Sequence, residues 1–95
     1  MRPMKFFIDT HDRQTGTFPA QLSKQDFAGF YAKYQEVCRE EGVVSLRVHV
    51  GLEPGRAFCF NMAPDAAAVQ RVHERLGLPF DSIVEVSTVT PGDLF

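Results

Sequence analysis

The sequence predicts an α+β fold, a ferredoxin-like βαββαβ sandwich in which a four-stranded antiparallel sheet carries two helices on one face. Two observations support this prediction. Strand-type and helix-type spacings of apolar residues follow one another in the order strand, helix, strand, strand, helix, strand. The 95 residues, 44% hydrophobic and 23% charged, have the composition of one globular domain. We therefore expect a single ferredoxin-like domain over residues 1–95, with a loop at 12–22 and a tail at 89–95.

The first half of the chain predicts a strand, a long loop and a helix. Residues 5–9, KFFID, are a short aromatic run bounded by polar residues, which is typical of a strand. After the loop, Ser23 and Asp26 have the spacing of a helix cap and its acidic partner. Apolar side chains then recur every three or four positions, which predicts a helix to about Glu41. These side chains are Phe27, Phe30, Tyr31, Tyr34, Val37 and Cys38.

The second half predicts a hairpin, a second helix and a last strand. Residues 43–52 and 57–62 have strand-like patterns and are separated by the turn sequence EPGR. Pro64 marks the start of the second helix and Gly77 marks its end. The last strand is expected at 82–88. Right-handed crossovers then place the first and third strands in the middle of the sheet, with the second and fourth outside.

Alternation along the strands predicts which side chains lie on the sheet face that the helices leave open. The predicted set combines a ring with charged and polar groups. Its members are Phe7, Asp9, His11, Ser45, Arg47, His49, Ile83, Glu85 and Ser87. The strand at 57–62 is apolar on both sides, and central strands of that kind need cover on both faces. We expect a second copy to supply it, giving a homodimeric α/β barrel with Phe7, Arg47 and Glu85 in the enclosed ligand cavity.

Candidate metal ligands come from separate elements of the predicted fold: His11, His73, Asp9, Cys59 and His49. His11 follows Asp9 at the end of the first strand, and metal-bound histidines commonly have a carboxylate beside them. Imidazole and oxygen ligands suit nickel, zinc and copper. His73 and Cys59 also have a purely structural interpretation. His73 lies on an apolar helical stripe, where a buried histidine bonded to a neighbour is expected. A lone cysteine is often a small buried hydrophobe.

The face on which Cys59 lies depends on the register of the hairpin. A three-residue connection places Cys59 opposite His49 and on the open face of the sheet. A two-residue turn places Cys59 on the helix face and turns Phe58 and Phe60 to the open face. A slip of one residue reverses every side chain of a strand, and the sequence leaves both registers open.

Charge and composition exclude several partners. The net charge of −2 argues against a nucleic acid, because duplex binding needs clustered Lys and Arg. The segment RAFCF is only a partial match to the stacked-aromatic surface of RNA recognition motifs. No apolar run approaches the roughly 20 residues that span a bilayer, and the first residues lack the long apolar core of a signal peptide. We therefore expect a cytoplasmic protein with no membrane partner, in which Cys38 and Cys59 are free thiols.

Three segments resemble a family of small bacterial ferredoxin-like proteins typified by a nickel-binding protein. They are FIDTH at the end of the first strand, GRAFCFNMAPDAAAVQRVH in the middle of the chain, and GLPFDSIVEV near its end. The resemblance extends over residues 5–11 and 42–88. It implies a dimeric α/β barrel and, by extension, binding of a transition metal. The chain departs from the family pattern in a longer loop at 12–22 and in His49, where the family has an aromatic residue.

These observations favour a small cytoplasmic homodimer that binds a divalent transition metal, nickel by preference, in or near its cavity, over an enzyme. One alternative is an enzyme resembling the cofactor-free monooxygenases of the dimeric α/β-barrel fold, with Asp9, His11, Arg47 and Glu85 in acid–base roles. Arg47 favours it, because a cation repels a metal dication and anchors an anionic substrate. The remaining alternatives are a small-ligand binding module that uses the same cavity and an interaction module without a ligand.

Overall fold

The computed structural model describes residues 3–93, so the last two residues of the predicted tail lie outside the described part of the chain. The helices and strands follow the predicted order, with one additional 3-10 turn. They are β1 (Lys5–Asp12), η1 (Arg13–Thr15), α1 (Lys24–Glu40), β2 (Val44–Gly51), β3 (Arg56–Ala63), α2 (Ala66–Leu76) and β4 (Ser82–Val86). Within residues 3–93, none of the helices is long and apolar enough to cross a membrane.

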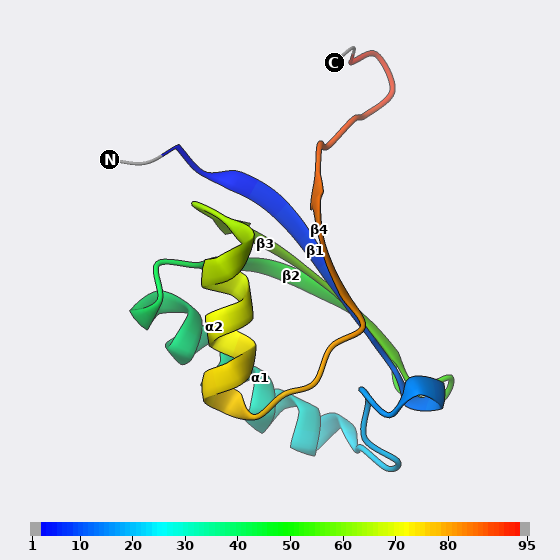
Figure 1. The fold of residues 1–95 in the computed structure, drawn as a ribbon. Helices are drawn as coiled ribbons and strands as arrows, with labels where there is room; N and C mark the ends of the chain where they lie inside the picture. Colours follow the sequence, from blue (N-terminus) through cyan, green and yellow to red (C-terminus); the bar gives the residue numbers. More distant parts are fainter. Residues whose placement is uncertain (1–2, 94–95) are drawn as a thin grey trace.

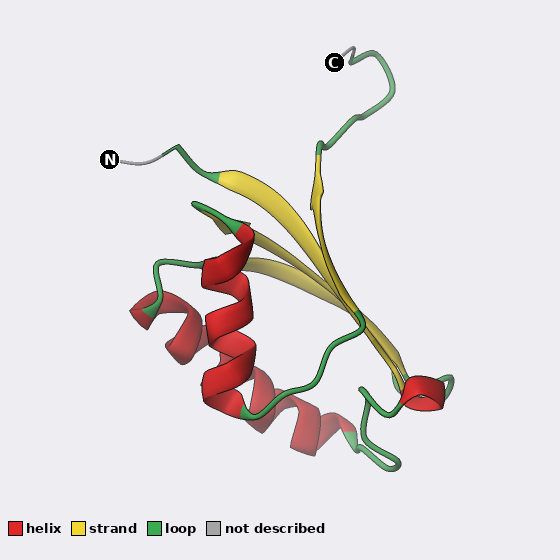
Figure 2. Ribbon diagram, in the orientation of Figure 1, coloured by secondary structure: helices red, strands yellow, loops and turns green. Residues whose placement is uncertain are grey.

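The four strands form one antiparallel sheet in the order β2-β3-β1-β4. The first and third strands are therefore central, as predicted. Both α-helices lie on one face of this sheet (Figure 1), and Figure 2 shows that face as a helical layer beside the strand layer. The predicted ferredoxin-like α+β fold is confirmed.

Both α-helices begin at capping residues that the sequence indicates. The Ser23 hydroxyl accepts a hydrogen bond from the backbone N–H of Asp26 at 3.0 Å. The Asp65 carboxylate accepts one from the backbone N–H of Ala68 at 2.9 Å. Each bond satisfies an N–H group of the first turn that has no partner inside the helix. Gly77 ends α2 in the left-handed conformation, as a C-terminal glycine commonly does.

The first strand is three residues longer than predicted. Thr10, His11 and Asp12 continue the pairing of β1 with β3, so the strand ends only at η1. The polar sequence THD suggests a loop, but a backbone paired to a central strand keeps its ladder bonds whatever its side chains are. This extension places His11 over the sheet instead of beyond its end.

The faces of β1 and β4 are opposite to the prediction. Phe7, Asp9 and His11 are buried on the helix face, while Val84 on β4 is exposed on the open face. The alternation sorts these side chains into two sets correctly, but it does not say which set lies beneath the helices. The expectation is wrong here because Asp9 and His11 find buried partners beneath the helices.

An irregularity in β2, between Ser45 and Arg47, divides the strand into two parts with opposite phase. The Ser45 hydroxyl lies 2.8 Å from the Tyr31 hydroxyl of α1, so Ser45 is on the helix face, contrary to the prediction. Arg47 lies over the Phe60 ring, and His49 is exposed on the same open face, as predicted. A bulge of this kind inserts one residue into the alternation, which a strict period of two misses.

Cys59 lies on the helix face of the sheet, directly opposite Asp9 of β1. Phe58 and Phe60 consequently lie on the open face. This arrangement matches the second of the two registers considered for the hairpin. The connection between β2 and β3 is four residues long, 52–55, instead of two.

Arg13 links the segment after β1 to the β2–β3 connection. Its guanidinium donates hydrogen bonds to the backbone carbonyls of Pro19 at 3.2 Å, Glu53 at 2.9 Å and Leu52 at 3.0 Å. Its backbone N–H donates to the Gly55 carbonyl at 2.8 Å. One side chain thus holds the loop against the end of the hairpin, and the loop forms a wall above the sheet.

Gly55→Ala is expected to destabilise the protein by about 2 kcal/mol, because its backbone is left-handed and an added Cβ would meet Arg13. The φ angle is +73°, and the nearest Arg13 atom would be only 2.7 Å away. Gly29→Ala in α1 is the control: its added Cβ meets no atom within 4 Å, so we expect a gain of about 0.5–1 kcal/mol from helix propensity. Urea unfolding measures both, and an unchanged midpoint for Gly55→Ala would contradict the strain at this position.

Candidate metal centre

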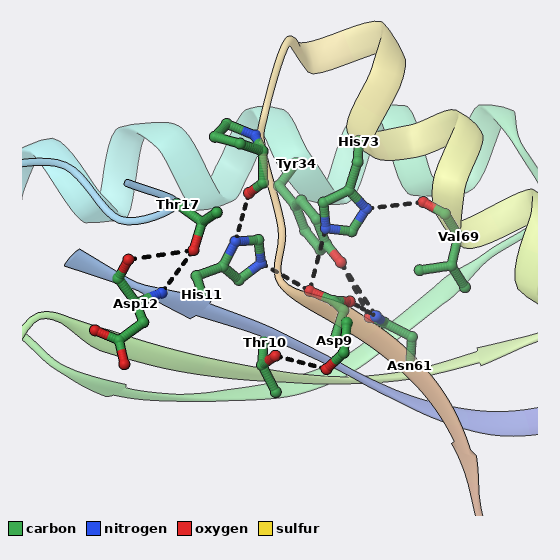
Figure 3. Close-up of polar contacts among 11 residues, drawn as sticks. Asp9, Thr10, His11, Asp12, Thr17, Tyr34, Asn61, Val69 and His73 are labelled. Atoms are coloured by element: carbon green, nitrogen blue, oxygen red, sulfur yellow. Dashed lines mark hydrogen bonds and ion pairs between the residues drawn. The ribbon is translucent and has the colours of Figure 1, made fainter. Parts of the chain in front are cut away.

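Asp9, His11 and His73 form a buried polar group between the sheet and the helices (Figure 3). Asp9 and His11 are two positions apart on β1, so both side chains point to the same face. His73 comes from α2, on the same helical stripe as the buried Val69 and Val72. The three side chains are 0%, 3% and 1% exposed, respectively. Each side chain offers one potential ligand atom, and these three atoms lie within 4.8 Å of one another.

Both imidazole rings point to one carboxylate oxygen. His11 Nε2 lies 2.8 Å from Asp9 Oδ1, and His73 Nε2 lies 3.1 Å from the same atom. The two rings are nearly parallel, with centroids 5.4 Å apart. Figure 3 shows the rings approaching Asp9 from two different elements, and the three atoms bracket one small region of space.

The other nitrogen of each ring contacts a backbone carbonyl. His11 Nδ1 lies 2.8 Å from the Pro79 oxygen, and His73 Nδ1 lies 2.8 Å from the Val69 oxygen. A carbonyl oxygen can only accept, so each Nδ1 carries a hydrogen and donates it. The Nε2 contacts with the Asp9 carboxylate are hydrogen bonds only when Nε2 carries a hydrogen as well, and a bound metal ion would take the place of that hydrogen. Coordination through Nε2 leaves the remaining hydrogen on Nδ1, and a carbonyl partner on that second nitrogen is typical of metal-bound histidine.

Asn61 holds the second oxygen of the carboxylate, and Tyr34 holds Asn61. The Asn61 amide donates to Asp9 Oδ2 at 2.8 Å, and the same amide nitrogen lies 3.1 Å from the Tyr34 hydroxyl. Across residues 3–93, no buried side-chain nitrogen or oxygen lacks a hydrogen-bond partner. The network therefore leaves Asp9 Oδ1 to the two imidazoles and fixes the plane of the carboxylate.

The network shifts the pKa values of its members. Burial disfavours the ionised Asp9, but hydrogen bonds from His11 and His73 outweigh burial, and the pKa of Asp9 is below its ordinary value. Burial also disfavours the His73 cation, but its hydrogen bond to Asp9 and the carboxylate charge outweigh burial and raise its pKa. Burial is the main cause of the raised pKa values of Tyr34 and Cys59, so both stay protonated at neutral pH.

The metal-free protein is expected to be most stable in mildly acidic solution. The raised pKa of His73 gives a stabilisation that is complete below the ordinary histidine value of 6.5 and is lost as pH rises through the folded-state value. The lowered pKa of Asp9 gives a stabilisation present above 3.8 and lost as pH falls through its folded-state value.

The melting temperature of the metal-free protein, measured from acidic to alkaline pH, reports both the acidic and the alkaline decline in stability. His73→Gln removes the imidazole and should abolish the alkaline decline. His49→Gln, at the exposed histidine of β2, should leave it unchanged. An alkaline decline that persists in His73→Gln would assign it to another group.

The other predicted metal ligands lie outside this group. His49 is exposed on the open face of the sheet, on the opposite side from the helices. Cys59 lies opposite Asp9 and on the correct face, but it does not belong to the group of mutually close ligand atoms. The structure thus brings together three of the five candidates.

Phe7, Arg47 and Glu85, which were predicted to line a cavity between two copies, do not share one face of the sheet. Phe7 is 1% exposed and belongs to the hydrophobic core beneath the helices. Arg47 lies on the open face, over an aromatic ring. Glu85 lies opposite Phe7 on the helix face, but it is exposed there and its carboxylate is 3.9 Å from the Lys5 ammonium. The wrong phase assigned to β1 and β4 accounts for this correction.

Asn61 and Tyr34 are site residues that the sequence analysis did not identify. Asn61 is a polar residue within the apolar strand AFCFNM, and such a position was a usable signal of a buried hydrogen bond. Tyr34 gave no signal, because it continues the aromatic stripe of α1 and was assigned to the core.

Comparisons with known proteins agree with the observed fold, and the matched segment includes all three residues of the buried polar group. A family model described as "Nickel responsive protein SCO4226-like" matches residues 7–86, which include Asp9, His11 and His73. The crystal structure of SCO4226 from Streptomyces coelicolor A3(2) is similar, with a TM-score of 0.75 and 28% sequence identity. The similarity covers 90% of this chain and 99% of that chain. No curated protein sequence matches the chain.

Proposed function

The chain belongs to the family of SCO4226-like nickel responsive proteins, and from this premise we propose that it binds a divalent transition metal, nickel by preference. The ligands are His11 Nε2, His73 Nε2 and the Asp9 carboxylate. The observation that carries the proposal is the convergence of both Nε2 atoms on one carboxylate oxygen, at 2.8 and 3.1 Å. The family description supplies the preference for nickel.

The group has the chemistry and the dimensions of a metal site. Two imidazoles and a carboxylate suit a borderline transition metal ion, whereas calcium and magnesium prefer oxygen ligands alone. Ligand bonds of about 2.1 Å at right angles place neighbouring donor atoms about 3 Å apart. The two nitrogen–oxygen distances are already close to this value. The Pro79 and Val69 carbonyls, together with Asn61, orient the three ligands from behind.

His11 is the outermost of the three ligands. This histidine borders an apolar cavity next to the loop after β1, while Asp9 and His73 lie behind it. Three protein ligands leave coordination positions for water or a small molecule. The acid–base set of the enzyme alternative receives no support, because Arg47 lies on the opposite face of the sheet from His11.

Calorimetric titration of the metal-free protein with nickel tests the proposal. We expect saturable binding of one ion per chain and release of protons, because the imidazoles must be neutral to coordinate. Repeating the titration in buffers of different ionisation enthalpy measures the proton release. A titration at micromolar nickel with no saturable heat would contradict the proposal.

We also propose that two copies of the chain pair through the open face of the sheet. This face is apolar across all four strands. Its apolar side chains are Phe6, Ile8, Val44, Phe58, Phe60, Met62, Val84 and Val86. Arg47 and Arg56 lie over the rings of Phe60 and Phe58, so even the cations extend the apolar surface. A face of this kind is complementary to itself, as a two-fold interface requires.

Val84→Lys is expected to convert the dimer into a folded monomer. Val84 is 49% exposed on β4, so a lysine is tolerated in the single chain but places a charge in the paired interface. Gln70→Lys, at an exposed position of α2, is the control for added charge. Sizing by light scattering should give a dimer for the wild type and the control. A monomeric wild type would contradict the pairing.

A further inference from the structure

An apolar cavity lies between α1, the loop after β1 and the helix face of the sheet. Its volume is about 140 Å³. Aromatic rings of Phe18, Phe27, Phe30 and Tyr31 line its walls, and Ala57 of β3 is at its floor. Arg13, whose hydrogen bonds hold the loop to the hairpin, keeps the Phe18 wall in place, because its guanidinium stacks on the Phe18 ring at 5.5 Å.

The lining of the cavity contains none of the acidic or strongly basic side chains: no Asp, Glu, Lys or Arg is among the described residues that border it. The Asp9 carboxylate is behind His11 and already has three hydrogen-bond contacts. The cavity is therefore distinct in chemistry from the polar group, although His11 borders both. An ion or a strongly polar molecule would lose its hydration here without compensation.

We propose that this cavity binds a neutral molecule with a single aromatic ring. Its volume is close to that of an engineered apolar cavity of about 150 Å³ that binds benzene. Aromatic walls favour an aromatic occupant, because rings gain energy from edge-to-face and offset-stacked contacts beyond that of apolar burial. The small side chain of Ala57 leaves the space at the floor into which the ring fits.

Nuclear magnetic resonance of the metal-free protein with toluene as the probe tests this site without reference to nickel. Toluene should give saturable shifts of the methyl signals of Leu22, Val48 and Leu78, which border the cavity. Benzoate, which has the same ring and a charge, should give none. Ala57→Leu fills the floor and should weaken toluene binding at least tenfold. Ala32→Leu, at an exposed position of α1, is the matched control and should bind toluene as the wild type does.

The proposal would be overturned by an absence of methyl shifts with toluene, by equal toluene binding in Ala57→Leu and Ala32→Leu, or by equal binding of benzoate and toluene. Shifts confined to the methyls of Val84 and Val86 would also overturn it, because they place toluene on the open face of the sheet. If Ala57→Leu does not fold, Val48→Phe closes the same cavity from β2 and gives the same readout.

Discussion

Asp9→Ala is expected to destabilise the metal-free protein by about 3–5 kcal/mol, the cost of removing one partner from a buried ionic group. The His73 cation and the Asn61 amide would both remain buried without the carboxylate that they contact. A domain of this size is stable by only about 5–15 kcal/mol. The loss therefore removes a large share of the total and should be the largest effect of any substitution at the polar group.

Urea unfolding in mildly acidic solution, where His73 is charged, measures this effect. Glu85→Ala is the control, because its ion pair with Lys5 is exposed and should contribute less than about 1 kcal/mol. Asp9→Asn keeps hydrogen-bonding capacity without the charge. Its loss in the free energy of unfolding should be intermediate between those of Asp9→Ala and Glu85→Ala. A loss for Asp9→Ala no larger than that for Glu85→Ala would show that the group contributes little to folding.

His11→Ala is expected to lower the affinity for nickel by more than about 100-fold, because loss of a supporting contact alone costs about 10- to 100-fold. His11 borders the cavity, so its truncation leaves fewer buried partners unpaired than truncation of Asp9 does. His49→Ala is the matched control, since it removes an exposed imidazole on the other face of the sheet.

Competition with a chromophoric chelator gives the affinities of both variants and the wild type. The account requires a large loss for His11→Ala and none for His49→Ala. Wild-type affinity in His11→Ala would exclude His11 as a ligand. A loss in His49→Ala alone would place the ion on the open face of the sheet.

The order of the elements and the helix starts are predictable because local residues determine them. Ser23 caps α1 and Asp65 caps α2 through bonds to residues three positions away, and a cap of this kind is visible in the sequence. Sheet order also follows, because crossovers have a fixed hand. These features depend on neighbours in the chain, and the structure agrees with them.

The faces of the strands could not be predicted, because they depend on partners far away in the chain. The buried position of Asp9 is favourable only when His73 and Asn61 face it, and they are 64 and 52 positions away. The open face is rich in apolar residues, so hydrophobicity did not distinguish the two sides of β1 and β4. The bulge between Ser45 and Arg47 has no local signal such as glycine.

The site was predictable in part for the same reason. Asp9 and His11 are two positions apart on one strand, so the sequence places them together, and His73 lies on the buried stripe of the helix that covers the sheet. Cys59 and His49 fit the chemistry equally well. The register of β2 and β3 puts His49 on the other face of the sheet, whereas Cys59 lies opposite Asp9 but outside the group of mutually close ligand atoms.

Anomalous diffraction at the nickel absorption edge, from crystals of the nickel-loaded protein, tests the central claim most directly. The account requires the strongest anomalous peak to lie about 2.1 Å from Nε2 of both His11 and His73 and within bonding distance of the Asp9 carboxylate. A strongest peak at His49, with the three buried side chains still bonded to one another, would contradict it.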